Sequence, residues 1–168
     1  MTREEEQRVH FIIWKSKLYM EKRDNSMIIS KNLILNEFNF LEREYYFTPH
    51  CRDIQDATFI EKTQLEYINE VRRRNVRVSC VKGKVINDVI YTFTASITRI
   101  PYVGNEDYFS LNNYLESIGK DFDTSLTNEF NEKVAEEILK KIAAALKEHA
   151  LKIIEGSVWL ETYYPRRD

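Results

Sequence analysis

Apolar residues near the start of the chain recur at helical spacing. Thr2 and Glu5 form a capping-box pattern, and the apolar positions that follow predict a helix ending at residues 23–26. The segment 30–47 also has helical spacing, although its β-branched and aromatic content leaves an extended strand open. The spacing favours a helix in both segments.

The next stretch predicts a loop followed by another helix. Pro49 disfavours helical geometry in the residue before it, so a loop is expected over residues 48–57. Thr58 and Glu61 repeat the capping-box pattern, and apolar residues at helical spacing continue from there. We therefore expect a helix over residues 58–74.

Residues 76–100 change to a period of two. Apolar and polar residues alternate over 76–80 and again over 89–98, which is typical of two antiparallel strands. The turn between them is either Lys82-Gly83-Lys84 or Asn87-Asp88, and the second pair suits a two-residue turn better. The pattern predicts a β-hairpin without fixing its register.

The last third of the chain predicts two helices and a strand. Ser110 is a good N-cap for a short helix that Gly119 ends. An apolar stripe then runs along residues 126–155, and a helix of that length would span ~45 Å, longer than one small core needs. Part of this helix is therefore expected to pack on another chain. Residues 157–164 alternate again and predict a strand that rejoins the sheet.

Together these elements predict a single α+β domain over residues 1–168. Its helical N-terminal part would cover residues 1–75, and the hairpin, the long helix and the last strand would cover 76–168. The small antiparallel sheet would consist of the hairpin 76–100 and the strand 157–164, with the long helix lying across it.

Composition describes an ordinary globular chain with an unusual supply of aromatic residues. The 168 residues are 43% hydrophobic and 31% charged, which is far from the composition of disordered chains. Ten tyrosines and nine phenylalanines stand against four glycines, so long regular elements are expected. The net charge of -2 disfavours a protein whose main role is to coat a phosphate backbone.

The cysteines indicate a reducing compartment, and the hydropathy predicts no membrane span. Cys51 and Cys80 lie far apart in a chain with no secretory signal, which suits thiols without a disulfide. No apolar run approaches the ~18 residues that a membrane span needs. We expect a cytoplasmic or virion protein with no membrane contact.

Catalytic, metal and cofactor signatures are not found in the sequence. There is no C-x-x-C or H-x-x-x-H pattern, and the isolated glycines allow neither a P-loop nor a dinucleotide fingerprint. Residues 121–132 resemble an EF-hand loop but carry Leu126 where the sharp turn needs glycine, so they are better explained as N-cap candidates. We nominate no catalytic, cofactor-binding or metal-binding residue.

Two features remain as candidates for partner binding. The first is a basic segment without acidic residues, interpreted as the last turn of a helix that leads into the hairpin, where the helix dipole favours cations. The second is a tyrosine pair within the aromatic segment 36–47. A solvated surface is the favoured interpretation of the basic segment, followed by an acidic protein partner and then a phosphate backbone. The candidate residues are Arg72, Arg73, Arg74, Arg77, Lys82 and Lys84, with Tyr45 and Tyr46.

These observations favour a non-enzymatic structural or interaction subunit, part of an oligomer or of a larger complex such as a viral particle. Its partners would be proteins, either copies of itself or other subunits. The alternatives are a nucleic-acid-binding accessory protein that uses the segment 72–84, and an enzyme with dispersed catalytic residues.

Overall fold

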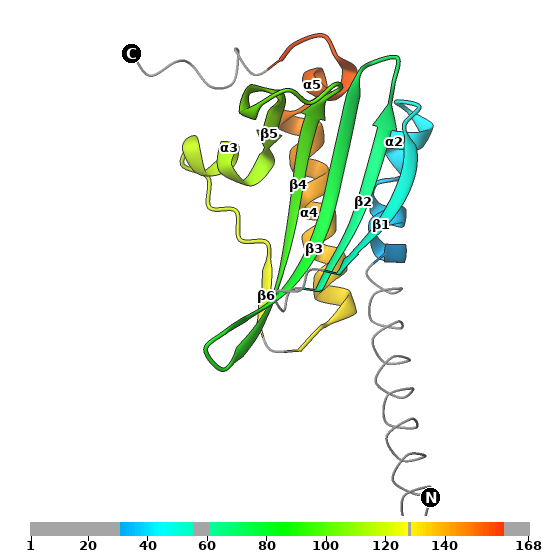
Figure 1. Ribbon diagram of the computed structural model, residues 1–168. Coiled ribbons are helices and arrows are strands. Elements are labelled where there is room, and N and C mark those ends of the chain that lie inside the picture. Colours follow the sequence, from blue (N-terminus) through cyan, green and yellow to red (C-terminus); the bar gives the residue numbers. More distant parts are fainter. Residues whose placement is uncertain (1–30, 56–60, 128, 160–168) are drawn as a thin grey trace, which may run out of the picture.

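Figure 1 shows the computed structural model, which describes residues 31–55, 61–127 and 129–159. An antiparallel sheet forms one layer and helix α4, Glu132–His149, runs behind strands β3 and β4 of that sheet. This confirms the α+β fold class. The helix expected near the N-terminus lies outside the described residues.

In the described part of the chain the sheet has six strands, and its order along the hydrogen-bonded path is β1-β2-β3-β4-β5. Strands β5 and β6 pair with different parts of β4, at residues 96–98 and 90–92 respectively, and all pairings are antiparallel. The strands are β1 Thr48–Gln55, β2 Glu61–Asn69, β3 Arg74–Val85, β4 Asp88–Arg99, β5 Tyr108–Ser110 and β6 Ser125–Thr127.

Strands β1 and β2 correct the expected loop over 48–57 and the expected helix over 58–74. Leu65 and Tyr67 are buried in the core and pair with Val78 and Val76 of β3. The residues between and beside them point to the other face of the sheet, so the side chains of β2 alternate with a period of two. Pairing on both sides outweighs a helical spacing of apolar residues, because β-structure depends on cross-strand neighbours more than on local propensity.

The predicted hairpin is confirmed as β3 and β4. Val85 pairs with Asp88, so the connection is Ile86–Asn87, one residue earlier than the Asn87-Asp88 alternative and beyond the Lys82-Gly83-Lys84 alternative. Ile86 adopts a left-handed conformation with φ of 57°. The alternating apolar residues of both strands face α4, as expected from their period.

The helix expected within 30–47 is confirmed. Residues 31–37 are helical, and α2 follows as Asn39–Arg43. The short helix is α3, Leu111–Ser117, and the Ser110 side chain accepts a hydrogen bond from the backbone N–H of Asn113. Gly119 follows with φ of 74°, the conformation that favours glycine.

The long helix is shorter than expected. It begins at Glu132 because residues 125–127 pair with β4, and it is interrupted at Ala150 before the short helix α5, Leu151–Glu155. Its length within one chain therefore gives no reason to invoke a second chain. Residues 157–159 do not form a strand, and the rest of the expected strand 157–164 lies outside the described residues.

The core lies between α4 and the sheet face that α4 covers. Its largest fully buried side chains include Tyr67, Phe93, Phe109, Leu139 and Ile142. Within the part of the chain that the structure describes, no helix is long and apolar enough to cross a membrane.

Candidate functional site

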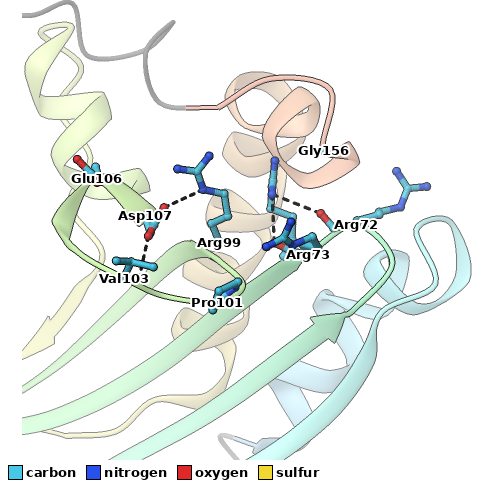
Figure 2. Close-up of a pocket in the computed structure, with 9 residues that line it drawn as sticks. Arg72, Arg73, Arg99, Pro101, Val103, Glu106, Asp107 and Gly156 are labelled. Carbon is cyan, nitrogen blue, oxygen red and sulfur yellow. Dashed lines mark hydrogen bonds and ion pairs between the residues drawn. The ribbon is translucent and has the colours of Figure 1, made fainter.

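A pocket of about 540 Å³ opens at the end of the sheet where β3 begins and β4 ends. Four arginines line it, Arg72, Arg73, Arg74 and Arg99. Figure 2 shows this arginine pocket between the β2–β3 turn, the β4–β5 connection and the segment after α5. The rest of its lining is Pro101, Val103, Glu106, Asp107 and Gly156.

The register of the hairpin places two of these arginines, Arg74 and Arg99, side by side. Arg74 is the first residue of β3 and pairs with Arg99, the last residue of β4. Paired residues of an antiparallel ladder point to the same face, and here it is the face that carries the core. The Ile100 N–H donates to the Arg73 carbonyl at 2.9 Å, which extends the pairing into the turn.

Arg74 is the most buried of the four, with 6% of its surface exposed. Its Nε–H donates to the Ile153 carbonyl at 3.0 Å, and its Nη1 donates to the carbonyls of Arg72 and Arg73. No carboxylate among the described residues forms an ion pair with it. Burial, and then the nearby charges of Arg99 and Arg73, lower the pKa of this guanidinium. Among the described residues, backbone carbonyls and the face of an aromatic ring hold this buried cation, with no carboxylate beside it.

Asp107 orients Arg99. The Arg99 Nε–H donates to Asp107 Oδ1 at 2.7 Å, and the other carboxylate oxygen accepts the Val103 N–H at 2.9 Å. These hydrogen bonds, from Val103 first and then Arg99, lower the pKa of the buried Asp107. The carboxylate thus fixes the β4–β5 connection and holds the Arg99 side chain at the pocket (Figure 2).

Arg73 occupies a strained position in the β2–β3 turn. Its φ is 56°, a region in which non-glycine residues are uncommon. Its exposed side chain donates from Nε to the Ile100 carbonyl at 2.8 Å. Glycine or asparagine would fit this backbone at lower cost, so Arg73 places a charged side chain where the backbone favours other residues.

Arg72 differs from the other three. Figure 2 shows its guanidinium directed away from Arg99. Its Nη1 donates to the Glu155 carbonyl at 2.7 Å, and its guanidinium carbon lies 5.9 Å from the centre of the Tyr45 ring. Arg72 therefore joins the turn to the end of α5, and it lines the pocket without directing its charge into it.

Trp159 lies against two of the arginines. The guanidinium carbons of Arg74 and Arg99 lie 4.7 and 5.2 Å from its ring centre. Its indole N–H donates to the Glu106 carbonyl at 2.7 Å. Arginine stacks well on an indole face, so Trp159 keeps both guanidinium groups in place.

The structure brings together only part of the basic segment. Arg77 pairs with Glu66 on the other sheet face, and Lys82 lies 5.8 Å from the Tyr91 ring. Lys84 pairs with Val89 near the far end of the hairpin, ~33 Å along β3 from Arg74 at the usual rise per residue. The expected helix end at Arg72–Arg74 is wrong, because these residues form a turn and a strand start. Tyr45 contacts Arg72, while Tyr46 is 77% exposed.

Sequence reasoning missed Arg99, Asp107 and Trp159. A signal existed for Arg99: once the two-residue turn at Ile86–Asn87 is fixed, counting back along both strands pairs Arg99 with Arg74. The partners of Trp159 are distant in sequence, so no local pattern indicated it. Asp107 binds Val103 and Arg99, four and eight residues before it, but these residue types at this spacing form no recognised motif.

A second polar cluster lies on the sheet face that α4 does not cover. Glu66 is 2% exposed, and its carboxylate lies 3.1 Å from Arg52 Nε and 3.0 Å from Arg77 Nε. The Arg77 contact is an ion pair rather than a well-aligned hydrogen bond. Gln64 donates to Glu66 at 2.8 Å and accepts from Ser79 at 3.3 Å. Apart from the Arg77 Nε–H, these groups are hydrogen-bonded within the cluster, and Arg77 keeps its ion pair, so the cluster is explained by stability.

The other reactive residues that the structure describes do not form a site with one another. Cys51 is exposed on β1 and Cys80 is buried on β3, with no disulfide between them. The His149 ring nitrogen Nε2 lies 2.9 Å from Lys120 Nζ. Among residues 31–55, 61–127 and 129–159, no group of three or more His, Cys, Asp or Glu residues is placed to hold a metal ion.

Comparison with known proteins gives no relative: no family model, no curated protein and no solved structure matches the chain significantly. Arginine side chains with few carboxylates, at an open pocket, define a candidate anion-binding site.

Proposed function

We propose that this chain is a non-enzymatic interaction subunit that binds a partner protein through the arginine pocket. The observation that carries the proposal is Arg74, a buried guanidinium with no carboxylate partner among the described residues. Buried charges in proteins are normally paired, because desolvating an unpaired charge is costly. An acidic group of a partner would supply the missing negative charge.

Exposed apolar side chains around the pocket support a protein partner. Val71 in the β2–β3 turn is 95% exposed, and Tyr102 and Val103 in the β4–β5 connection are 55% and 79% exposed. Interfaces combine arginine and tyrosine anchors with apolar contacts that exclude water. A partner that covers this rim would desolvate the arginines and strengthen their hold on an acidic group.

Membership of an oligomer or a larger complex stays a prediction. The sequence suggested an oligomer or a larger particle, including a virion, partly from the length of one helix, and the break at Ala150 weakens that part of the argument. The nucleic-acid alternative rested on a continuous basic segment, and the placement of Arg77 and Lys82 away from the pocket gives it no support.

Quantitative affinity capture with three baits tests the proposal. The baits are the wild type, Arg73→Gln, and the matched control Arg43→Gln, an exposed arginine on α2 outside the pocket. We expect a partner that the wild type and the control retain and Arg73→Gln loses, with the same pattern when the partner is purified and titrated. Identical retention by all three folded baits would refute the proposal. Light scattering shows whether the partner is a second copy.

A further inference from the structure

Three arginines of the pocket are each anchored through Nε. Arg73 donates to the Ile100 carbonyl, Arg74 to the Ile153 carbonyl and Arg99 to Asp107, at 2.8, 3.0 and 2.7 Å. Anchoring through Nε fixes the plane of each guanidinium. It leaves the outer edge of Arg73 and Arg99, and the Nη2 group of Arg74, for another acceptor. Within the described residues, the Nη groups of Arg73 and Arg99 and the Nη2 of Arg74 donate no hydrogen bond.

The charges of these three groups are poorly balanced. Arg99 and Arg73 both act on Arg74 as like charges, and within the described part of the chain only Arg99 of the three has a carboxylate in an ion pair. Glu106 also lines the pocket, so the lining holds four arginines against two carboxylates. An anion bound between the arginines would relieve their mutual repulsion.

We propose that the arginine pocket binds a phosphoryl group carried on a side chain of the partner protein. The three anchored guanidinium groups come from the β2–β3 turn, the start of β3 and the end of β4. A phosphoryl group offers three strong acceptor oxygens and a charge of about -1.5 to -2 at pH 7, which suits donors that arrive from several directions. A carboxylate needs fewer donors than three guanidinium groups offer, as Asp107 shows by binding one Arg99 N–H and the Val103 N–H.

A protein-borne phosphoryl group fits the surroundings better than a nucleic acid. Val103 lines the pocket, and the exposed Val71 and Tyr102 are next to lining residues in the sequence, so side chains of a bound peptide can contact this apolar rim. A nucleic acid needs a continuous row of positive charge, but Arg77 lies on the other sheet face in an ion pair with Glu66 and the chain has a net charge of -2. This inference rests on the proposed function and narrows its acidic group to one chemical class.

Trp159 provides a direct reporter of binding. The chain has two tryptophans, so Trp14→Phe leaves Trp159 alone beside Arg74 and Arg99. The probes are inorganic phosphate, the peptide Ala-Val-pSer-Val-Ala, its unphosphorylated form, its glutamate form and a short single-stranded DNA. We expect saturable changes in Trp159 emission with phosphate and the phosphopeptide, and at least ~10-fold weaker binding of the unphosphorylated and glutamate peptides.

Two arginine variants identify the site of binding. Arg73→Gln removes an exposed guanidinium that has no carboxylate partner among the described residues, so the fold should survive. It should weaken phosphopeptide binding by roughly 10-fold, as expected for one charge-assisted hydrogen bond, while Arg43→Gln leaves binding unchanged. Circular dichroism confirms that each variant is folded.

Several results would overturn the phosphoryl assignment. These are the lack of a saturable response in the folded protein, equal affinity for the glutamate peptide, tighter binding of the DNA, or equal weakening by Arg43→Gln. If the captured partner still depends on Arg73 but is indifferent to phosphatase treatment, the interaction function stands and the phosphoryl group is excluded. If no partner depends on Arg73, the proposed function itself fails.

Discussion

Replacing Ile86 with asparagine should stabilise the protein. Ile86 lies in the two-residue β3–β4 turn with φ of 57°, and its side chain is 88% exposed. A β-branched residue is a true outlier in the left-handed region, whereas asparagine adopts it readily through local hydrogen bonding. The substitution relieves backbone strain and gives up almost no buried surface.

The size of the effect follows from the left-handed penalty. That penalty is about 1–2 kcal/mol for an ordinary L-residue, and asparagine still pays part of it. We therefore expect Ile86→Asn to raise the free energy of unfolding by about 1 kcal/mol. For a chain of this length, each 1 kcal/mol raises the Tm by ~2–4 °C.

Urea and thermal unfolding of matched variants measure this effect. Val71→Asn is the control, because Val71 is an equally exposed β-branched residue in the other hairpin turn and is not in the left-handed region. The urea midpoint should rise for Ile86→Asn at an unchanged m-value, and should stay level or fall for Val71→Asn. A loss of stability in Ile86→Asn, or an equal gain in both variants, would refute the role of turn strain.

Three further substitutions test other parts of the fold. In urea melts, Glu66→Gln should lower the free energy of unfolding by about 1–3 kcal/mol. This is less than for a fully buried ion pair, because Arg52 and Arg77 are partly exposed. The control Glu148→Gln removes an exposed carboxylate and should lower it by only ~0–1 kcal/mol. Ile142→Ala should cost ~2–5 kcal/mol because it opens a cavity at a fully buried site, and Val134→Ala on the same helix should cost far less. The lowered pKa of Asp107 means that its contribution is fully present above the ordinary value of 3.8 and is lost as pH falls through the lower folded value. Melts of the wild type and Asp107→Asn between about pH 2 and pH 6 should therefore converge at the acid end, and a constant difference would contradict this linkage.

Local patterns predicted the elements whose pairing partner is adjacent in sequence. The β3–β4 hairpin is such an element, because alternation on both strands and a short turn lie within one window. The helix α3 is another, since the Ser110 cap and Gly119 are both local signals. In both cases the local preference agrees with the global fold.

The same reasoning failed for β2 because its local and tertiary preferences conflict. A capping-box pattern and helical spacing are present over 58–74, but Leu65 and Tyr67 are buried only when the strand lies between β1 and β3. Cross-strand pairing of this kind is not visible in a window of one segment. The error also misplaced the arginines, since a helix end would have left Arg74 solvated rather than buried.

The position of the arginines depends on the register between β3 and β4, and residue types alone do not specify that register. A slip of one residue between β3 and β4 would turn Arg99 to the polar face, away from Arg74, Trp159 and the end of α5. The two-residue turn at Ile86–Asn87 fixes that register from the far end of the hairpin. The left-handed residues Ile86 and Arg73 thus lie in the two turns that place the arginines. The turn at Ile86 sets which residues of β3 and β4 face each other, and the turn at Arg73 presents a charge at the pocket. Relieving strain at Ile86 should stabilise the fold and leave the pocket intact, whereas replacing Arg73 should weaken binding whatever it does to stability.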